Sequence, residues 1–195
     1  MSARRYTGIC TRLIMITYCS TTSASELKQI LALQQENLPT VLTSEEKNKE
    51  GFVTVHHDLD ILKRMHNACP HIIAKHRKAI IGYALSMHPK FGNEIDVLKP
   101  MFKEIQNSTL KNALFIVMGQ ICIEKEYRGQ GIFRELYKTM AKELASEFNH
   151  IVTEVDAENR RSIQAHYAVG FQKLKTYTAA GKVWELIYLP IELYT

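Results

Sequence analysis

The sequence Gln-Ile-Cys-Ile-Glu-Lys-Glu-Tyr-Arg-Gly-Gln-Gly-Ile-Phe, residues Gln120–Phe133, decides the fold. It continues an apolar run that begins at Ala113 and predicts a buried strand as far as Ile123. Two glycines, Gly129 and Gly131, then precede an amphipathic run. Glycine lets a ligand approach the backbone, and the first amides of a helix have no partner inside the helix. Together these features predict an anion-binding turn between a strand and a helix.

The glycine spacing alone is weak evidence for a ligand, because a strand-to-helix turn can need glycine for its geometry. Two phosphate-binding motifs are excluded: no Gly-Lys-Ser or Gly-Lys-Thr occurs, and no third glycine stands at the dinucleotide-binding distance. Arg128 and Arg134 flank the turn and add positive charge that would attract an anion.

The segment behind the turn predicts the clearest helix of the chain. Apolar residues recur every four positions at Ile132, Leu136, Met140, Leu144 and Phe148, while charged residues fill the opposite side. This period is typical of a surface helix that packs one face on a core.

The stretch Ile121–Ile132 resembles the acyl-CoA-binding signature of the GNAT superfamily of N-acyltransferases, in which Arg or Gln is followed by two residues, Gly, one residue, and Gly or Ala. Arg128 and Gly131 match this pattern. Phe133 departs from it at the last position, where a bulky side chain either crowds the pyrophosphate or packs inward. A second stretch, Asn159–Phe171, resembles the family motif that closes the pantetheine side.

The resemblance implies a single α/β domain with a mixed, mostly antiparallel, splayed sheet flanked by helices. We expect residues 1–12 to form a flexible N-terminal tail and residues 13–195 to form the acyl-CoA N-acyltransferase domain. The length of 195 residues suits one domain with a substantial core. The long connection Lys90–Asn112 predicts a short helix at Pro100–Gln106, which is either surface filler or a lid near the acceptor.

The resemblance also implies direct acyl transfer, in which an amine attacks the thioester carbon and the CoA thiol departs. The expected donor is acetyl-CoA, and the expected acceptor is a primary amine whose identity stays open. Asn159 has an alternative role as a helix N-cap. The residues that match cofactor-binding positions of the family are Ile121, Cys122, Ile123, Arg128, Gly129, Gln130, Gly131, Ile132, Phe133, Arg134 and Asn159.

Glu154 is the predicted general base, because it ends an apolar strand and a carboxylate there could accept the proton of the amine. The alternative is a solvated charge at the end of a strand, and Glu124 is a second candidate for the base. Cys122 could act as a nucleophile, but we favour the interpretation that it is a small apolar residue that fills space in the core.

The general acid is predicted to be Tyr167 or His166. The family usually has tyrosine at the position that His166 occupies, so the register of the motif favours His166. A phenol matches a thiolate better, since the pKa of Tyr is about 10 and that of His about 6.5, and on this ground we prefer Tyr167. Successive helical residues turn by about 100°, so only one of the two can face the thiol, and either could be a core residue.

Composition argues against several other classes of protein. The net charge of +5 and the pI near 9.0 suit an anionic cofactor, but no run of five Lys or Arg residues indicates nucleic-acid binding. The four cysteines and eight histidines lack metal-ligand spacing, so no metal is expected and reduced thiols in the cytoplasm are favoured. No apolar run is long enough to span a membrane. A non-catalytic CoA-binding regulatory or interaction module is the alternative function, and a homodimer is left open.

Overall fold

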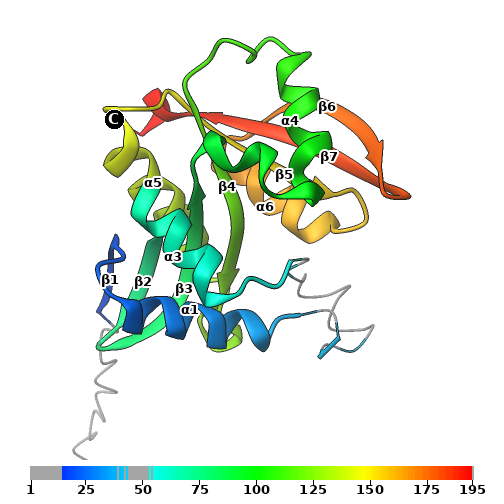
Figure 1. The fold of residues 1–195 in the computed structure, drawn as a ribbon. Helices are drawn as coiled ribbons and strands as arrows, with labels where there is room; N and C mark the ends of the chain where they lie inside the picture. The colour runs from blue at the N-terminus through cyan, green and yellow to red at the C-terminus, as the bar shows by residue number, and fades with distance from the viewer. Residues whose placement is uncertain (1–14, 39, 42, 44–52, 54, 195) are drawn as a thin grey trace, which may run out of the picture.

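The computed structural model describes residues 15–38, 40–41, 43, 53 and 55–194 (Figure 1). The predicted tail, residues 1–12, lies outside this part of the chain, as does most of the polar stretch that follows α1. The described residues form one seven-stranded sheet in the order β1-β2-β3-β4-β5-β7-β6. The strands are β1 (Ile16–Ser20), β2 (Ile72–His76), β3 (Ala79–Met87), β4 (Phe115–Ile123), β5 (His150–Asp156), β6 (Gln172–Ala179) and β7 (Lys182–Pro190).

Neighbouring strands are antiparallel except β4 and β5, which are parallel. This arrangement confirms the predicted α/β fold with a mixed, mostly antiparallel sheet. The helices in the described part of the chain are α1 (Ala24–Gln35), α3 (Leu59–Ala68), η1 (Pro89–Asn93), η2 (Asp96–Leu98), α4 (Lys99–Gln106), η3 (Lys125–Tyr127), α5 (Ile132–Leu144), α6 (Arg160–Val169) and η4 (Ile191–Leu193).

Two apolar cores form, one on each face of the sheet. Helices α1, α3 and α4 contribute residues such as Leu27, Leu62 and Ile105 to one core. Helices α5 and α6 contribute Leu136 and Val169 to the other. A sheet covered on both faces needs apolar residues throughout its central strands, which explains the unbroken apolar run of β4.

Side-chain caps define where the two N-terminal helices begin. Ser23 and Glu26 form a capping box at the start of α1, each side chain bonding the backbone of the other residue. Asp58 caps α3, because its side chain accepts a hydrogen bond from the amide of Ile61 at 2.8 Å. These caps fix the helix starts and thereby the packing of both helices on the sheet.

The parallel pair β4 and β5 is joined over only three residues of each strand. Pairing runs from Phe115–His150 to Val117–Val152, although both strands continue beyond it. On its other side, β4 carries a register shift against β3 between Met118 and Ile121. The shift places two residues of β4, Gly119 and Gln120, opposite one residue of β3, as in a β-bulge. The splayed strands leave room for the site described below.

The predicted helix in the long connection is present as α4. Its apolar residues Met101 and Ile105 are buried, and the rings of Phe102 and Phe115 are in contact. Lys175 of β6 forms an ion pair with Glu104 of α4. The connection is therefore packed on the sheet, and a role as a lid remains a prediction. In the described part of the chain, no helix is both long enough and apolar enough to cross a lipid bilayer.

Candidate active site

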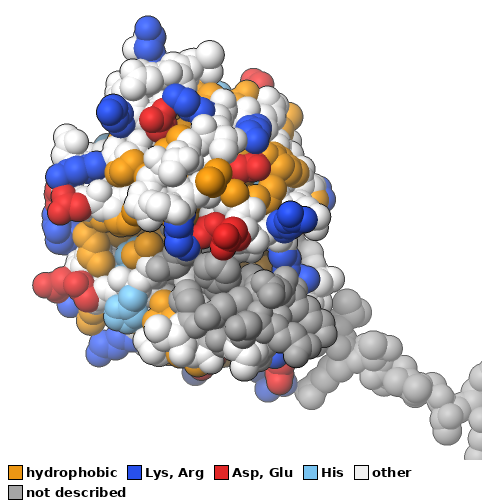
Figure 2. All heavy atoms as spheres, turned by 90° about the vertical axis from the view of Figure 1, so that its right-hand side faces the viewer, with side chains coloured by type: hydrophobic (Ala, Val, Ile, Leu, Met, Phe, Trp, Pro, Cys, Tyr) orange, Lys and Arg blue, Asp and Glu red, His pale blue; other side chains and the backbone are white. Residues whose placement is uncertain are grey.

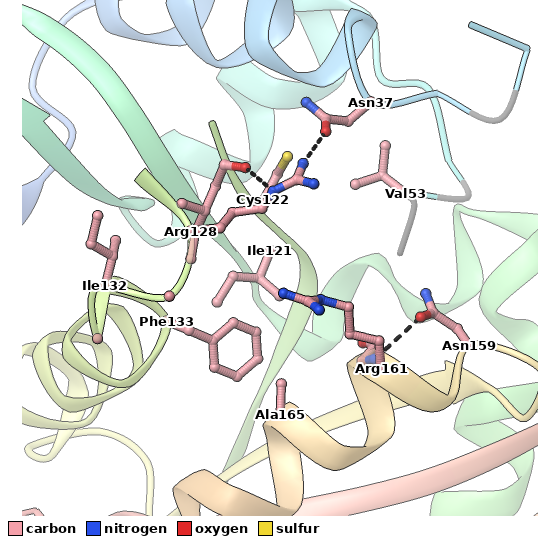
Figure 3. A pocket seen from close by; sticks show the side chains of 14 residues that line it. Asn37, Val53, Ile121, Cys122, Arg128, Ile132, Phe133, Asn159, Arg161 and Ala165 are labelled. Carbon is pink, nitrogen blue, oxygen red and sulfur yellow. Dashed lines mark hydrogen bonds between the residues drawn. The ribbon is translucent and has the colours of Figure 1, made fainter. Parts of the chain in front are cut away.

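A cleft of about 320 Å³ opens where the glycine turn, the end of β4 and the start of α6 meet (Figure 3). This size falls within the usual range for small-molecule sites. Its walls come from the segment after α1, β4, the glycine turn with the start of α5, and α6, so the fold brings together segments that are far apart in the sequence. The residues that line the cleft are Asn37, Val53, Ile121, Cys122, Ile123, Arg128, Gly129, Gly131, Ile132, Phe133, Asn159, Arg161, Ser162 and Ala165.

The glycine turn has the geometry of an anion cradle. Gly129 and Gly131 have φ values of 74° and 81°, a region that residues with a Cβ rarely adopt. A Cβ built on either glycine would meet no protein atom within 4 Å, so the space above the turn is open. Within the described residues, no side chain caps the start of α5. The first amides of this helix can therefore face a phosphate.

Two arginines place positive charge in the cleft, from opposite walls. The Nε–H of Arg128 donates to the carbonyl of Ile123 at 3.0 Å, and its Nη2 donates to Asn37 at 2.6 Å. Arg128 thus braces the glycine turn against β4 and the segment after α1. Arg161 extends from α6 across the cleft toward Ile121 (Figure 3). Both cations would favour an anionic ligand.

Phe133, which departs from the family pattern, packs against α5 and α6 and also lines the cleft. Its ring makes edge-to-face contacts with Tyr137 and His166, at centroid distances of 5.2 and 5.0 Å. Figure 3 shows the ring beside Ala165 on the floor of the cleft. The aromatic ring therefore forms part of the apolar wall between α5 and α6.

A second, smaller cavity of about 70 Å³ lies between the splayed strands, and we call it the chamber. It shares Val53, Ile121, Asn159 and Ser162 with the cleft, so the two cavities adjoin. The remaining residues of the chamber wall are Met118, Gly119, Gln120, Thr153, Glu154, Val155, Asp156, His166 and Trp184.

Glu154 supplies a carboxyl group to the chamber. The hydroxyl of Tyr177 on β6 donates a hydrogen bond to this carboxylate. Burial raises the pKa of Glu154 to about 7, although the hydrogen bond from Tyr177 acts in the opposite direction. A carboxyl group with this pKa can exchange a proton near neutral pH, as the prediction of a general base requires.

His166 lines the chamber but has both ring nitrogens engaged. Its Nδ1 lies 2.7 Å from the carbonyl of Ser162, which can only accept, so Nδ1 carries the proton. Nε2 then accepts from the hydroxyl of Tyr137 at 2.7 Å. Burial lowers the pKa of His166 to about 4, so the ring is neutral.

Tyr167 points away from both cavities. Its side chain is 38% exposed, and its hydroxyl donates to Glu185 on β7 at 2.5 Å. Partial burial and the Glu185 carboxylate raise the pKa of this phenol to about 12. The two candidate acids thus lie on different sides of α6, as their adjacency in a helix requires.

Cys122 and Asn159 both line the cleft. Cys122 is a buried, protonated thiol, and Asn159 is a helix cap. Burial raises the pKa of the Cys122 thiol to about 12, so it stays protonated at neutral pH. The side chain of Asn159 accepts from the amide of Ser162 at 3.2 Å and caps α6. The predicted cap is therefore present, and the same residue also reaches both cavities.

Two residues of the predicted cofactor set lie outside the cleft wall. Gln130 bonds the carbonyl of Glu126, and Arg134 bonds the carbonyl of Ala168 on α6. Five wall residues went unassigned in the sequence: Asn37, Val53, Arg161, Ser162 and Ala165. Arg161, Ser162 and Ala165 follow Asn159 in the same helix, so the sequence could have indicated that they lie near the site. Asn37 and Val53 carry no such signal in the sequence.

Comparison with known proteins identifies the family. A model described as the acetyltransferase (GNAT) family matches residues 27–171, which is more than half of the chain. The chain belongs to the GNAT acetyltransferase family and is an acyltransferase of this type, which confirms the resemblance of its two motifs. A search of curated proteins gives no match.

Solved structures share the fold at low sequence identity. The Escherichia coli ribosomal-protein-S18-alanine N-acetyltransferase has 14% identity and a TM-score of 0.60, over 91% of this chain and 94% of that one. The spermidine N-acetyltransferase of Vibrio cholerae, in complex with CoA and spermine, has 13% identity and a TM-score of 0.57, over 92% and 97%. A Salmonella typhimurium acetyltransferase, yncA, with its cofactor acetyl-CoA, has 14% identity and a TM-score of 0.59, over 90% and 94%.

Proposed function

We propose that the protein transfers an acetyl group from acetyl-CoA to a primary amine by direct attack. The observation that carries the proposal is the junction of two cavities, one with an open glycine cradle and one with a carboxyl group of pKa about 7. The first suits a pyrophosphate, and the second suits an amine that must lose a proton. The similar solved structures that contain CoA or acetyl-CoA support this donor.

The donor would lie along the cleft with its pyrophosphate at the glycine turn. The amides that begin α5 would face the phosphate oxygens, and Arg161 would approach from the opposite wall. The pantetheine arm would follow β4 beside Ile121, where β5 no longer pairs with the strand. The thioester would then reach the chamber at the boundary that both cavities share.

The chemistry needs one bond made and one bond broken. The amine nitrogen bonds the thioester carbon while Glu154 takes its proton, and the carbon–sulfur bond then breaks to give an amide and a thiolate. Amide N–H groups of β4 near the thioester oxygen would stabilise the charge that develops there, typically by about 3 kcal/mol. Glu154 is suited to the role of base because part of its population is ionised at neutral pH.

The thiolate also needs a proton, and we propose that solvent supplies it. His166 gives its one N–H to Ser162, and the hydroxyl of Tyr167 lies outside both cavities. Neither observation favours a side chain as the acid. Water in the open cleft could protonate a CoA thiolate directly.

The acceptor is an amine of undefined class. The names of two solved structures describe acceptors as different as a ribosomal-protein alanine and a polyamine. On the face shown in Figure 2, Lys and Arg side chains are interspersed with Asp and Glu, and the coloured atoms form no large patch of one sign. This surface gives no support to a nucleic-acid partner. The free thiols of Cys19, Cys69 and Cys122 favour a reducing compartment such as the cytoplasm.

The cofactor assignment is tested by Gly131→Glu, which places a carboxylate where the phosphate should lie. Calorimetry should show that CoA affinity falls by at least about 100-fold, because like charges would meet in the cradle. Gly181→Glu is the matched control, since Gly181 also has a positive φ of 73° and open space, but lies in the β6–β7 turn. Equal CoA affinity in the two folded variants would refute the cradle.

A further inference from the structure

One wall of the chamber is formed by a side chain that lies just beyond the paired part of β4 and β5. Backbone pairing between β4 and β5 ends at Val117 and Val152. Directly beyond it, the hydroxyl of Thr153 donates to the carbonyl of Met118 at 2.9 Å. Thr153 is only 3% exposed, so this hydrogen bond is shielded from water. The bond fixes how far apart the two strands are where the chamber begins.

Gln120 forms a second wall of the chamber and is held by three hydrogen bonds. Its Nε2 donates to the carbonyl of Val55 at 2.7 Å, and its Oε1 accepts from Tyr83 at 2.6 Å and from Gln34 at 2.5 Å. The Val55 carbonyl can only accept, so the amide cannot be flipped without losing these bonds. This wall cannot give way easily to a larger occupant.

A third wall is equally constrained, because Tyr177 holds the Glu154 carboxylate. The chamber is therefore small and bounded by hydrogen-bonded groups on several sides. Its volume of about 70 Å³ is less than a quarter of the 320 Å³ of the cleft. An acetyl group has only three non-hydrogen atoms, and each longer acyl group adds at least one more.

We propose that the chamber restricts the transferred group to acetyl, and that Thr153 and Gly119 are the residues that set this specificity. The inference rests on the proposed function, because it takes the chamber as the place where acyl group and amine meet. Each further methylene of a longer acyl chain would have to displace a hydrogen-bonded wall or the incoming amine. A tight pocket discriminates by roughly tenfold or more for each methylene.

Gly119 allows the opposite change in size. It lines the chamber, and apart from its two chain neighbours, the nearest atoms to a Cβ built on it belong to Leu85, Met65 and Met87, each at 3.9 Å. Its φ lies outside the positive region that strains other residues. Gly119→Ala should therefore fold and should reduce the space in the chamber. Thr153→Ala should enlarge it, because the hydroxyl and one methyl are removed.

The test measures kcat/KM for acetyl-CoA, propionyl-CoA and butyryl-CoA by thiol release. The acceptors are n-butylamine, spermidine, lysine and a peptide with a free N-terminal alanine. The wild type should prefer acetyl-CoA to butyryl-CoA by about 100-fold or more. Thr153→Ala should reduce this preference by roughly tenfold, and Gly119→Ala should increase it by a similar factor. CoA affinity, measured by calorimetry, should stay within about twofold of the wild type in both variants.

Thr178→Ala, on the exposed surface of β6, is the matched control and should leave the preference unchanged. If Thr153→Ala does not fold, Thr153→Ser carries the test, because it keeps the hydroxyl and removes only the methyl. Selectivity that is flat across the donors, or that moves in the same direction in both variants, would overturn the inference. Absence of thiol release from every donor and acceptor would instead count against the proposed function.

Discussion

Glu154 gains its near-neutral pKa from two opposing influences that come from different strands. Burial between the splayed strands destabilises the carboxylate, whereas the hydroxyl of Tyr177 stabilises it. The sequence places these residues 23 positions apart, and only the pairing of β7 with both β5 and β6 brings them together. If Glu154 is the base, as we propose, Tyr177 positions it without needing to touch the substrate.

Tyr177→Phe should move the acidic limb of the pH profile to higher pH. The hydrogen bond favours the ionised form of Glu154, so its loss should raise the pKa further above 7, by about one unit. The measurement is kcat/KM for acetyl transfer across pH. An acidic limb that stays in place would show that Tyr177 does not affect the pKa of the group that limits transfer. A limb that moves to lower pH would show that Tyr177 raises this pKa instead of lowering it.

Tyr167→Phe should leave acetyl transfer within about twofold of the wild-type rate. Its hydroxyl contacts Glu185 outside both cavities, so its removal takes no proton donor from the site. Steady-state rates at saturating acetyl-CoA provide the measurement. A fall of roughly 10²-fold or more, the usual effect of removing a general acid, would restore Tyr167 as the acid that thiolate chemistry first suggested.

At the scale of elements, a buried chain of amides joins α1 to β4 and to the segment before α3. Gln34 is fully buried, and its Oε1 accepts from the amide of His57 at 2.8 Å. Its Nε2 donates both to Gln120 and to Nδ1 of His57, at 2.5 and 2.9 Å. One side chain therefore fixes the position of three segments beside the chamber.

Gln34→Leu should destabilise the fold by about 2–4 kcal/mol, because it leaves the His57 amide and the Gln120 oxygen without this partner. Urea denaturation gives the free energy of unfolding. Gln29→Leu is the control: it lies on the same helix and loses one hydrogen bond, from the amide of Ile80 at 3.1 Å. A cost no greater than that of the control would mean that solvent or another group readily replaces Gln34.

The elements were more predictable from sequence than the contacts between them. Helix caps such as Ser23 and the glycine turn carry local signals, because their geometry depends on neighbouring residues. The Gln34–Gln120 contact spans 86 positions and has no local signal. The packing of Phe133 against α6 and the outward orientation of Tyr167 likewise depend on tertiary contacts of α6, which periodicity alone does not define.

At the scale of the molecule, buried histidines should make stability depend on pH. Burial is the main cause that lowers the pKa of His57, His71 and His166 to about 4, from an ordinary value of 6.5. The unfolded chain therefore binds more protons than the folded one between these values. Stability should be fully present above pH 6.5 and should fall as the pH drops toward about 4. Glu154 has a raised pKa, so its contribution to stability increases as the pH falls. Because it is a single group, the three histidines should outweigh it.

The urea midpoint should accordingly decrease steadily from pH about 7 to pH about 4.5. Each pKa unit of difference corresponds to roughly 1.4 kcal/mol per group. A midpoint that stays constant over this range would show that the three rings are not held neutral in the folded protein.

The central claim is that the joined cleft and chamber form the site of N-acetyl transfer. Thiol release from acetyl-CoA, measured with n-butylamine, lysine, spermidine and an alanine-initiated peptide, tests it most directly when mass spectrometry follows the amine. The account predicts amine-dependent thiol release with an acetylated product, and a loss of roughly 10²–10⁴-fold in Glu154→Gln. CoA binding without amine-dependent release from any of these acceptors would contradict the account and favour a non-catalytic CoA-binding module.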